Sequence, residues 1–281
     1  MNDTNVLQSL KAIYDDLFEQ EKKVADFVLE HPSEVTNMSV TELAEHSNVS
    51  EATIMRLSKK AGCKGFYHFK ISLARNIQDE NTDQSYEIDL NDFNTSIHNI
   101  FQFKCEELKK GDELINRETV KKSLELIKTC DTLYIFGAGN TNPIAVYAGY
   151  QFTQYGIRTN VDIGPEMQTN AAFRMTEKDA CLLISNSGST NMILDIATIA
   201  KERNTPSIAI TSYEKSPLVN LVDHLLLSYT SEKTYFEAVS STRMAHLAII
   251  DMLLLLLSVD EDGKYHRYSS DREEFLAKYK S

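Results

Sequence analysis

Cysteine is scarce in this sequence, and no apolar segment is long enough to cross a membrane. The four cysteines form no Cys-x-x-Cys pair and no cysteine–histidine cluster with metal-ligand spacing. We therefore expect a reduced, cytoplasmic protein without a metal site. The longest apolar stretch, residues 245–259, is shorter than the ~20 residues of a bilayer span and is interrupted by His246 and Asp251. It predicts a buried helix, so we expect no membrane partner.

The composition and length predict a folded protein of two domains. Apolar residues make up 42% of the sequence and charged residues 25%, which is typical of a globular protein. The 281 residues exceed one average domain of ~100–200 residues. The N-terminus shows no basic segment followed by a short apolar run, so no secretory signal is expected.

Positive charge is also scarce overall, but it is concentrated in one segment. The net charge of −12 argues, by itself, against nucleic acid as a partner. Residues 50–76 nevertheless contain six Lys or Arg and one acidic residue, a net charge of +5, and acidic segments flank them. Because attraction to phosphate is a short-range, screened effect, such a patch can bind DNA within an acidic protein. The alternative is an ordinary solvated helix face.

The N-terminal third has the pattern of a helix-turn-helix. Apolar residues recur at three- and four-residue spacing over residues 3–61, which predicts helices. Ala44 is small enough to let a second helix cross closely, and Asn48 suits the left-handed residue of the turn. Ser50 is a natural N-cap of the second helix, whose buried face would include Ile54. An ordinary pair of packed helices is the alternative.

The outward face of the second helix favours a DNA reader over an ordinary packed pair. A helix in the major groove needs polar side chains for the bases and cations for the phosphates. We expect Thr53 to project outward beside the cations. The residues predicted to contact DNA are Ser50, Thr53, Arg56, Lys59, Lys60, Lys64 and Lys70.

From Thr132 onward, short apolar runs alternate with helical stretches, which predicts a doubly wound α/β domain with a parallel sheet. The predicted strands are Leu133–Phe136, Ile157–Val161, Cys181–Ser185, Ser207–Thr211 and Leu225–Leu227. The predicted helices are Pro143–Tyr155, Glu166–Met175, Met192–Arg203, a short one near Leu218, and Phe236–Ser258. We predict a DNA-binding domain at 1–76, a linker and connecting helix at 77–106, and the α/β domain at 107–281.

Two strand-to-helix loops of this domain have the composition of an anion site. The first, Gly137–Pro143, contains two glycines and Asn142, a possible helix cap; the second, Ser185–Thr190, combines one glycine with four hydroxyl groups. A loop that enters a helix presents unpaired N–H groups and a positive dipole end. In a sheet of strand order 2-1-3-4-5, these loops meet at the switch point. The sequence therefore predicts phosphate binding.

Dinucleotide binding and catalysis are weaker interpretations. The third glycine of the dinucleotide fingerprint is replaced by Asn142, so we expect no cofactor. Ser187 does not lie in a Gly-x-Ser-x-Gly elbow. Glu166, Glu237 and His246 are candidate acid/base groups, but each has an ordinary structural explanation. We therefore expect a protein that is not an enzyme.

Taken together, these segments resemble the RpiR family of bacterial transcription regulators, which join an N-terminal helix-turn-helix to a sugar isomerase (SIS) domain. The segments that carry the resemblance are Val49–Arg56, Gly62–Phe66, Gly137–Gly139, Ser185–Thr190, Ile208–Thr211 and Arg243–Asp251. The resemblance implies an all-α helix-turn-helix domain joined to a five-stranded doubly wound parallel sheet of SIS type. It also implies a regulator that binds a double-stranded DNA operator and controls genes of carbohydrate metabolism. The apolar stretch at residues 245–259 and the geometry of half-site reading predict a homodimer or homotetramer.

By the same resemblance, a sugar phosphate is the expected effector. The residues that would bind it are Gly139, Asn140, Thr141, Ser185, Ser187, Gly188, Thr190 and Glu237. Glu166 stands where many relatives carry a different polar residue, and it bears on which sugar is bound. Two alternatives remain, because one fold serves several functions: a sugar-phosphate isomerase or etherase, and a ligand sensor that has lost DNA binding.

Overall fold

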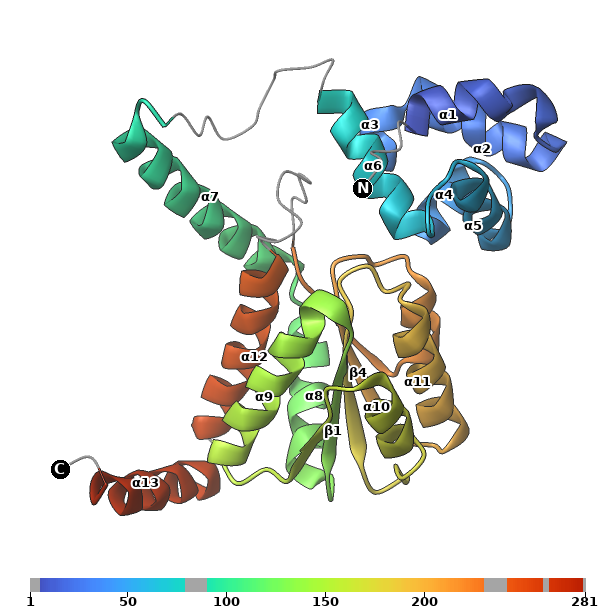
Figure 1. Cartoon of the computed structure of the whole chain (residues 1–281). Helices are drawn as coiled ribbons and strands as arrows, with labels where there is room; N and C mark the ends of the chain where they lie inside the picture. The colour runs from blue at the N-terminus through green and yellow to red at the C-terminus, as the bar shows by residue number, and fades with distance from the viewer. Residues whose placement is uncertain (1–5, 79–89, 230–241, 260–262, 280–281) are drawn as a thin grey trace. The chain divides into compact units, whose positions relative to one another are not determined.

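The computed structural model describes residues 6–78, 90–229, 242–259 and 263–279, which form two compact units (Figure 1). One unit consists mainly of residues 1–106, and the other of residues 107–230 and 242–281. The domain boundaries at residues 76 and 106 stay predictions. None of the described helices is long and apolar enough to span a membrane.

A bundle of helices forms the first unit, which confirms the helical N-terminal third. Its helices are α1 (Val6–Ile13), α2 (Glu19–Glu30), α3 (Pro32–Val35), α4 (Val40–His46), α5 (Glu51–Lys60) and α6 (Phe66–Gln78), with a 3-10 turn, η1 (Tyr14–Asp16), after α1. Their apolar faces meet in one core, in which Leu43, Ile54 and Phe69 are completely or almost completely buried.

Two further helices, α7 (Phe93–Leu114) and α8 (Arg117–Thr129), precede the sheet. α7 begins within the predicted linker and connecting helix at 77–106 and continues to Leu114. α8 is absent from the sequence-based prediction, although Val120, Leu124 and Ile127 recur at spacings of four and three on its buried face. That periodicity is the signal from which α8 is recognisable.

A five-stranded parallel sheet in the order β2-β1-β3-β4-β5 forms the centre of the second unit. Its strands are β1 (Leu133–Gly137), β2 (Thr159–Val161), β3 (Ala180–Ile184), β4 (Ser207–Thr211) and β5 (His224–Leu227). Every residue of β1, β3 and β4 is buried, as expected for parallel strands with helices on both faces. The predicted fold class and strand order are confirmed, and β2 is two residues shorter at its start than predicted.

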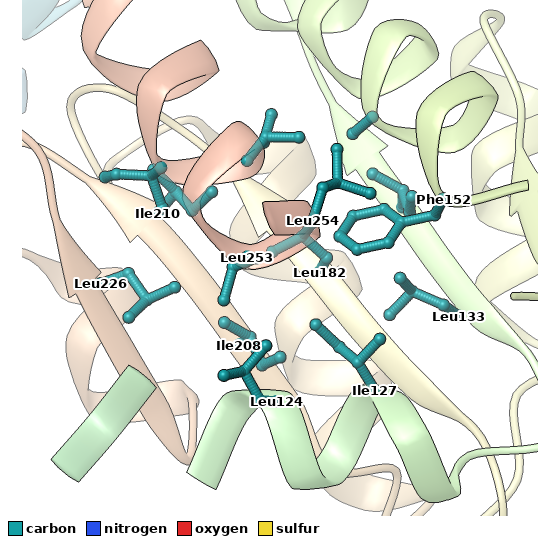
Figure 2. Close-up of a cluster of buried hydrophobic side chains, with 14 of the residues drawn as sticks. Leu124, Ile127, Leu133, Phe152, Leu182, Ile208, Ile210, Leu226, Leu253 and Leu254 are labelled. Atoms are coloured by element: carbon teal, nitrogen blue, oxygen red, sulfur yellow. The ribbon is translucent and has the colours of Figure 1, made fainter. Parts of the chain in front are cut away.

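Helices cover both faces of this sheet (Figure 1). One face packs against α8, α9 (Asn142–Gln154) and α12 (Thr242–Ser258), and the other against α10 (Pro165–Ala172), α11 (Asn191–Glu202) and the 3-10 turn η3 (Pro217–Leu221). Figure 2 shows the first of these cores, with Leu124, Ile127, Phe152, Leu182, Ile208 and Leu253 among its side chains.

The C-terminal part differs in detail from the prediction. α12 ends at Ser258 as predicted, and it is described from Thr242 onward; the predicted first turns, residues 236–241, lie outside the described residues. A last helix, α13 (Lys264–Ala277), is absent from the sequence-based prediction, and its Tyr265 is buried in the core beside α12.

Candidate DNA-binding and phosphate-binding sites

The turn between α4 and α5 has the geometry that the sequence predicts for a helix-turn-helix. Ser39 caps α4, because its Oγ accepts a hydrogen bond from Glu42 N at 3.1 Å. Asn48 adopts the left-handed conformation, with a φ of +51°, and Val49 N donates to Ala44 O. Ser50 Oγ then accepts a hydrogen bond from Thr53 N at 3.3 Å and caps α5. The predicted turn and cap are confirmed.

α5 divides into a buried face and an exposed face. Ile54 and Leu57 are each only 1% exposed and pack in the core of the bundle. The exposed side chains of α5 include Ala52, Arg56 and Lys59. These three positions are separated by four and three residues, so they form one stripe along the helix.

The structure corrects the prediction that Thr53 projects outward. Thr53 is only 3% exposed, because it lies four residues before Leu57 and therefore on the same buried side of α5. Its Oγ1 lies 3.0 Å from Ser50 Oγ and accepts a hydrogen bond from Arg56 Nη2 at 3.2 Å. Thr53 therefore contacts the side chains beside it rather than facing solvent.

Lys60 joins α5 to α2 through an ion pair. Its Nζ lies 2.7 Å from Glu21 Oε2 and 4.7 Å from the centroid of the Phe18 ring. Glu21 is almost fully buried, which favours its neutral form. Hydrogen bonds from Lys60 and from the Phe18 N–H, with the nearby charge of Arg56, outweigh burial and lower the pKa of Glu21. The Lys60 ammonium is thus bound by an ionised carboxylate of its own chain.

The two remaining predicted cations lie after α5, and they differ in exposure. Lys70 is 8% exposed, and its Nζ donates a hydrogen bond to Met38 O at 2.7 Å. This contact corrects the prediction of Lys70 as a surface cation, because the ammonium ties α6 to the segment before α4. Lys64 is exposed, as predicted, and its backbone N–H donates to His68 Nδ1.

In the second unit, the loop between β1 and α9 is compact. Gly139 has a left-handed φ of +58°, and a Cβ at Gly137 would lie 2.6 Å from Thr141 O, so only glycine fits there. Thr141 is 8% exposed, and its Oγ1 donates a hydrogen bond to Ile184 O, the last residue of β3, at 2.7 Å. Gly139 and Asn140 are exposed.

The loop between β3 and α11 leads directly into a helix N-terminus. Gly188 has a φ of +58°, and a Cβ there would lie 2.1 Å from Ser216 Oγ. Ser185 is 2% exposed, and its Oγ donates to Thr190 Oγ1 at 3.5 Å. Ser187 and Thr190 are half-buried, and Ser187 Oγ accepts a hydrogen bond from Ser189 N.

These two loops lie beside each other at the carboxyl edge of the sheet. Gly137, the last residue of β1, pairs in register with Ile184, the last residue of β3. The Thr141–Ile184 hydrogen bond joins the first loop to the end of β3, directly before the second loop. The structure therefore brings together the predicted residues on both loops. Glu237, the remaining predicted residue of this site, lies outside the described residues.

Two side-chain amides beside these loops make contacts that the sequence-based prediction lacks. Gln168 of α10 is 1% exposed, and its Nε2 donates to Gly137 O at 3.0 Å. Asn142 does not cap α9 with its side chain; its Nδ2 donates instead to Ile163 O at 2.9 Å. Both amides fix the backbone of the loops, and no local motif in the sequence marks such long-range contacts.

The described acid/base candidates differ in environment. Glu166 is exposed in the first turn of α10, where a negative charge is favourable. His246 is completely buried, and among the described residues neither of its ring nitrogens has a hydrogen-bond partner. Burial lowers its pKa to about 4, so the imidazole is neutral at pH 7.

Two protein-family models match this chain. One describes the helix-turn-helix domain of the rpiR family and matches residues 4–80; the other describes the SIS domain and matches residues 126–256. The chain belongs to the RpiR family. As an RpiR-family protein with both domains, it is a helix-turn-helix transcriptional regulator.

Relatives of this RpiR-family chain match over nearly its whole length. An uncharacterised HTH-type transcriptional regulator from Caldanaerobacter subterraneus subsp. tengcongensis is 27% identical over 98% of both chains. Another from Thermotoga maritima is 28% identical over 95% of this chain and 97% of its own. The structure of the Vibrio vulnificus NanR protein complexed with ManNAc-6P has a TM-score of 0.83 at 22% identity, covering 98% of this chain and 99% of that one. That likeness shows a shared fold.

Proposed function

We propose that this regulator binds a double-stranded DNA operator through α5, and that a sugar phosphate bound at the loops after β1 and β3 changes its affinity for DNA. The observation that carries the proposal is the position of these two loops at neighbouring strand ends, with Thr141 of the first hydrogen-bonded to Ile184 directly before the second, in a chain whose other unit is a helix-turn-helix. The relative NanR was solved with ManNAc-6P, which supports a sugar phosphate as the effector class. Genes of carbohydrate metabolism are the corresponding targets.

The phosphate would lie at the N-terminus of α11. Backbone N–H groups and the helix dipole favour an anion there, and the half-buried hydroxyls of Ser187 and Thr190 add donors without adding charge. The left-handed Gly188 turns the backbone of the loop toward this helix end. The buried Ser185 would position Thr190 through the hydrogen bond from its Oγ to Thr190 Oγ1. The exposed Gly139 and Asn140 would contact the ligand from the other loop.

Thr141 has a different task in this proposal. Its hydroxyl has one hydrogen, and the nearest acceptor is Ile184 O at 2.7 Å. A hydroxyl that already donates to a buried carbonyl orders the loop rather than donating to the phosphate. Glu237, one of the effector-binding residues expected from the sequence, stays a prediction.

We infer that the SIS domain senses its ligand without converting it. Isomerisation of a sugar needs a positioned acid and base within hydrogen-bond reach of the substrate. Of the candidates that the structure describes, Glu166 is exposed to solvent and His246 is buried with no accessible surface. Incubation with sugar phosphates and analysis of the products by NMR would reveal turnover, which would overturn this inference.

We further propose that two or more copies assemble, because a helix-turn-helix reads an operator as a pair of half-sites about one helical turn, ~34 Å, apart. The C-terminal half of α12 is apolar on more than one side: Leu253, Leu254 and Leu257 pack in the core, while Leu255 and Leu256 are exposed. A helix that is apolar all round is normally covered. The second copy of this chain is the proposed cover.

Calorimetric titration with a panel of sugar phosphates and the corresponding free sugars tests the effector assignment. We expect a phosphorylated sugar to bind and its free sugar to bind at least tenfold more weakly. The same ligand should then change the affinity for an operator fragment in fluorescence anisotropy, because ligand control requires different affinities in the two states. Equal binding of the sugar and its phosphate would contradict the assignment.

A further inference from the structure

The polar side chains of α5 differ in their contacts within the protein, and from these contacts we infer which of them contact DNA. Resting on the proposed DNA binding, we propose that Arg56 recognises a guanine in the major groove. In the same proposal, Thr53 is a positioning residue, which holds the Arg56 guanidinium through its hydroxyl group and does not touch DNA. Lys59 contacts a phosphate, and Lys60 belongs to the packing of α5 on α2.

The exposed stripe of α5 determines which side chains can reach DNA. Ala52, Arg56 and Lys59 lie on it, opposite the buried Ile54 and Leu57. In a recognition helix, the N-terminal residues contact base edges. Ala52 and Arg56 precede Lys59, which lies in the last turn of α5. The bases are therefore within reach of Ala52 and Arg56, and the backbone within reach of Lys59.

Hydrogen bonds hold the Arg56 side chain in place before any DNA is present. Arg56 Nη2 donates to Thr53 Oγ1 at 3.2 Å, and Thr53 Oγ1 lies 3.0 Å from the N-cap hydroxyl of Ser50. Because Thr53 is only 3% exposed, its side chain has little freedom to move. A fixed guanidinium loses less rotamer freedom on binding, which raises both affinity and selectivity.

The guanidinium can satisfy Thr53 and a base together. It carries five N–H donors in a rigid fork, and the bond to Thr53 uses one of them. Guanine presents two acceptors, O6 and N7, on its major-groove edge, and a bidentate contact from arginine is the commonest specific contact with DNA. Ala52, one turn earlier, presents a methyl group that suits contact with the methyl group of thymine.

Lys60 cannot take the same role while its ion pair is intact. Its Nζ is 2.7 Å from the nearly buried Glu21 carboxylate, so its charge is largely compensated within the protein. A phosphate would have to compete with this contact. Lys59, which is exposed on the same turn, is therefore the phosphate contact of α5.

Selection from random duplex DNA by the full-length protein tests the assignment. We expect the wild type to enrich a motif with a guanine in each half-site. Arg56→Lys keeps the charge but loses the fork, so preference for that guanine should fall roughly 5- to 150-fold, the discrimination that a bidentate contact provides. The salt dependence of binding should stay unchanged. Lys59→Ala, the matched control, should weaken binding to all sequences, reduce the salt slope by about one and leave the motif unchanged.

Two variants of Thr53 test its positioning role. Thr53→Val removes the hydroxyl and should weaken the preference for the same guanine, whereas Thr53→Ser keeps the hydroxyl and should restore it. A residue with a merely structural role would change the unfolding temperature without changing the motif. Because Arg56 is exposed, Arg56→Lys provides a test that does not depend on the folding of the Thr53 variants.

The outcomes separate this inference from the proposed function. If the wild type enriches a motif and Arg56→Lys enriches the same motif with equal selectivity, the guanine assignment is overturned while DNA binding stands. If the wild type enriches no motif, the proposed operator binding is overturned and this assignment with it.

Discussion

Single hydroxyl groups of the two loops proposed to bind phosphate have different contacts, although the sequence presents them alike. Thr141 donates to the carbonyl of Ile184, and Ser185 is almost completely buried beside Thr190. Ser187 is half-buried, and its Oγ accepts a hydrogen bond from the backbone of Ser189. The hydrogen of the Ser187 hydroxyl is therefore available to a ligand, which makes Ser187 the strongest donor candidate.

Replacement of Ser187 by Ala should lower affinity for the effector about ten- to hundredfold. A hydrogen bond to a charged acceptor contributes roughly 1.5–3 kcal/mol, and the substitution removes one such donor. Calorimetric titration measures the change. Ser189→Ala is the matched control, because we expect that hydroxyl to point away from the site. Unchanged affinity of Ser187→Ala would contradict the phosphate assignment, as would an equal loss in the control.

His246 should make the α/β unit sensitive to acid. Burial lowers its pKa to about 4 in the folded state, while the unfolded value is 6.5. Between these values only the unfolded chain binds the proton, so the free energy of unfolding should rise with pH. The contribution of the neutral His246 to that free energy should be lost progressively as pH falls from about 6.5 to 4. Chemical denaturation at a series of pH values, followed by circular dichroism, measures this slope.

A variant without the imidazole isolates this contribution. His246→Leu should remove the part of the slope that lies between pH 4 and 6.5, a change on the order of 3 kcal/mol across the range. At pH 7 its stability should be close to that of the wild type, because a buried polar group without a partner among the described residues is replaced by an apolar one. Identical slopes for both proteins would show that His246 does not titrate in this way.

At the scale of an element, the loop between β3 and α11 depends on the left-handed Gly188. Gly188→Ala should lower both stability and effector affinity, because the left-handed conformation costs about 1–2 kcal/mol for a residue with a Cβ. The added Cβ would also lie 2.1 Å from Ser216 Oγ. Gly164→Ala is the control, since Gly164 has a φ of −78° and no atom lies within 4 Å of its added Cβ. Thermal melting should give a lower unfolding temperature, and titration a weaker effector affinity, for Gly188→Ala than for Gly164→Ala. Equal values for the two variants would contradict the predicted backbone strain at position 188.

The strands, most helices and the turn are predictable from sequence, because they depend on local periodicity and on residues with a special backbone, although α8 and α13 were not predicted. Asn48 is left-handed as its residue type suggests, and the strand order follows from alternating strands and helices. The tasks of Lys60 and Lys70 were not predictable. Their partners, Glu21 and Met38 O, are 39 and 32 residues away in the chain, so no local pattern shows that these cations are already bound.

At the scale of the whole molecule, the proposed assembly explains an otherwise uncovered surface in the α/β unit. Leu255 is 64% exposed on α12, and Val146 and Tyr150 are exposed on the neighbouring α9. The two helices are packed together, and Tyr147 Oη donates to Asp251 Oδ1 at 2.8 Å between them. Exposed apolar side chains on two packed helices are typical of a surface that binds another chain.

Leu255→Glu should therefore dissociate the assembly without unfolding the monomer. In a two-fold interface each substitution acts twice, and burial of one leucine side chain contributes roughly 1.5–3 kcal/mol, so the dissociation constant should rise at least about a hundredfold. Light scattering at micromolar concentration should change from a multiple of 31.9 kDa to that mass itself. The control is Phe173→Glu, a residue of similar exposure at the end of α10 on the other side of the sheet. A wild type that is monomeric yet binds its operator tightly would contradict the proposed assembly of two copies. An assembly that survives Leu255→Glu would place the interface elsewhere.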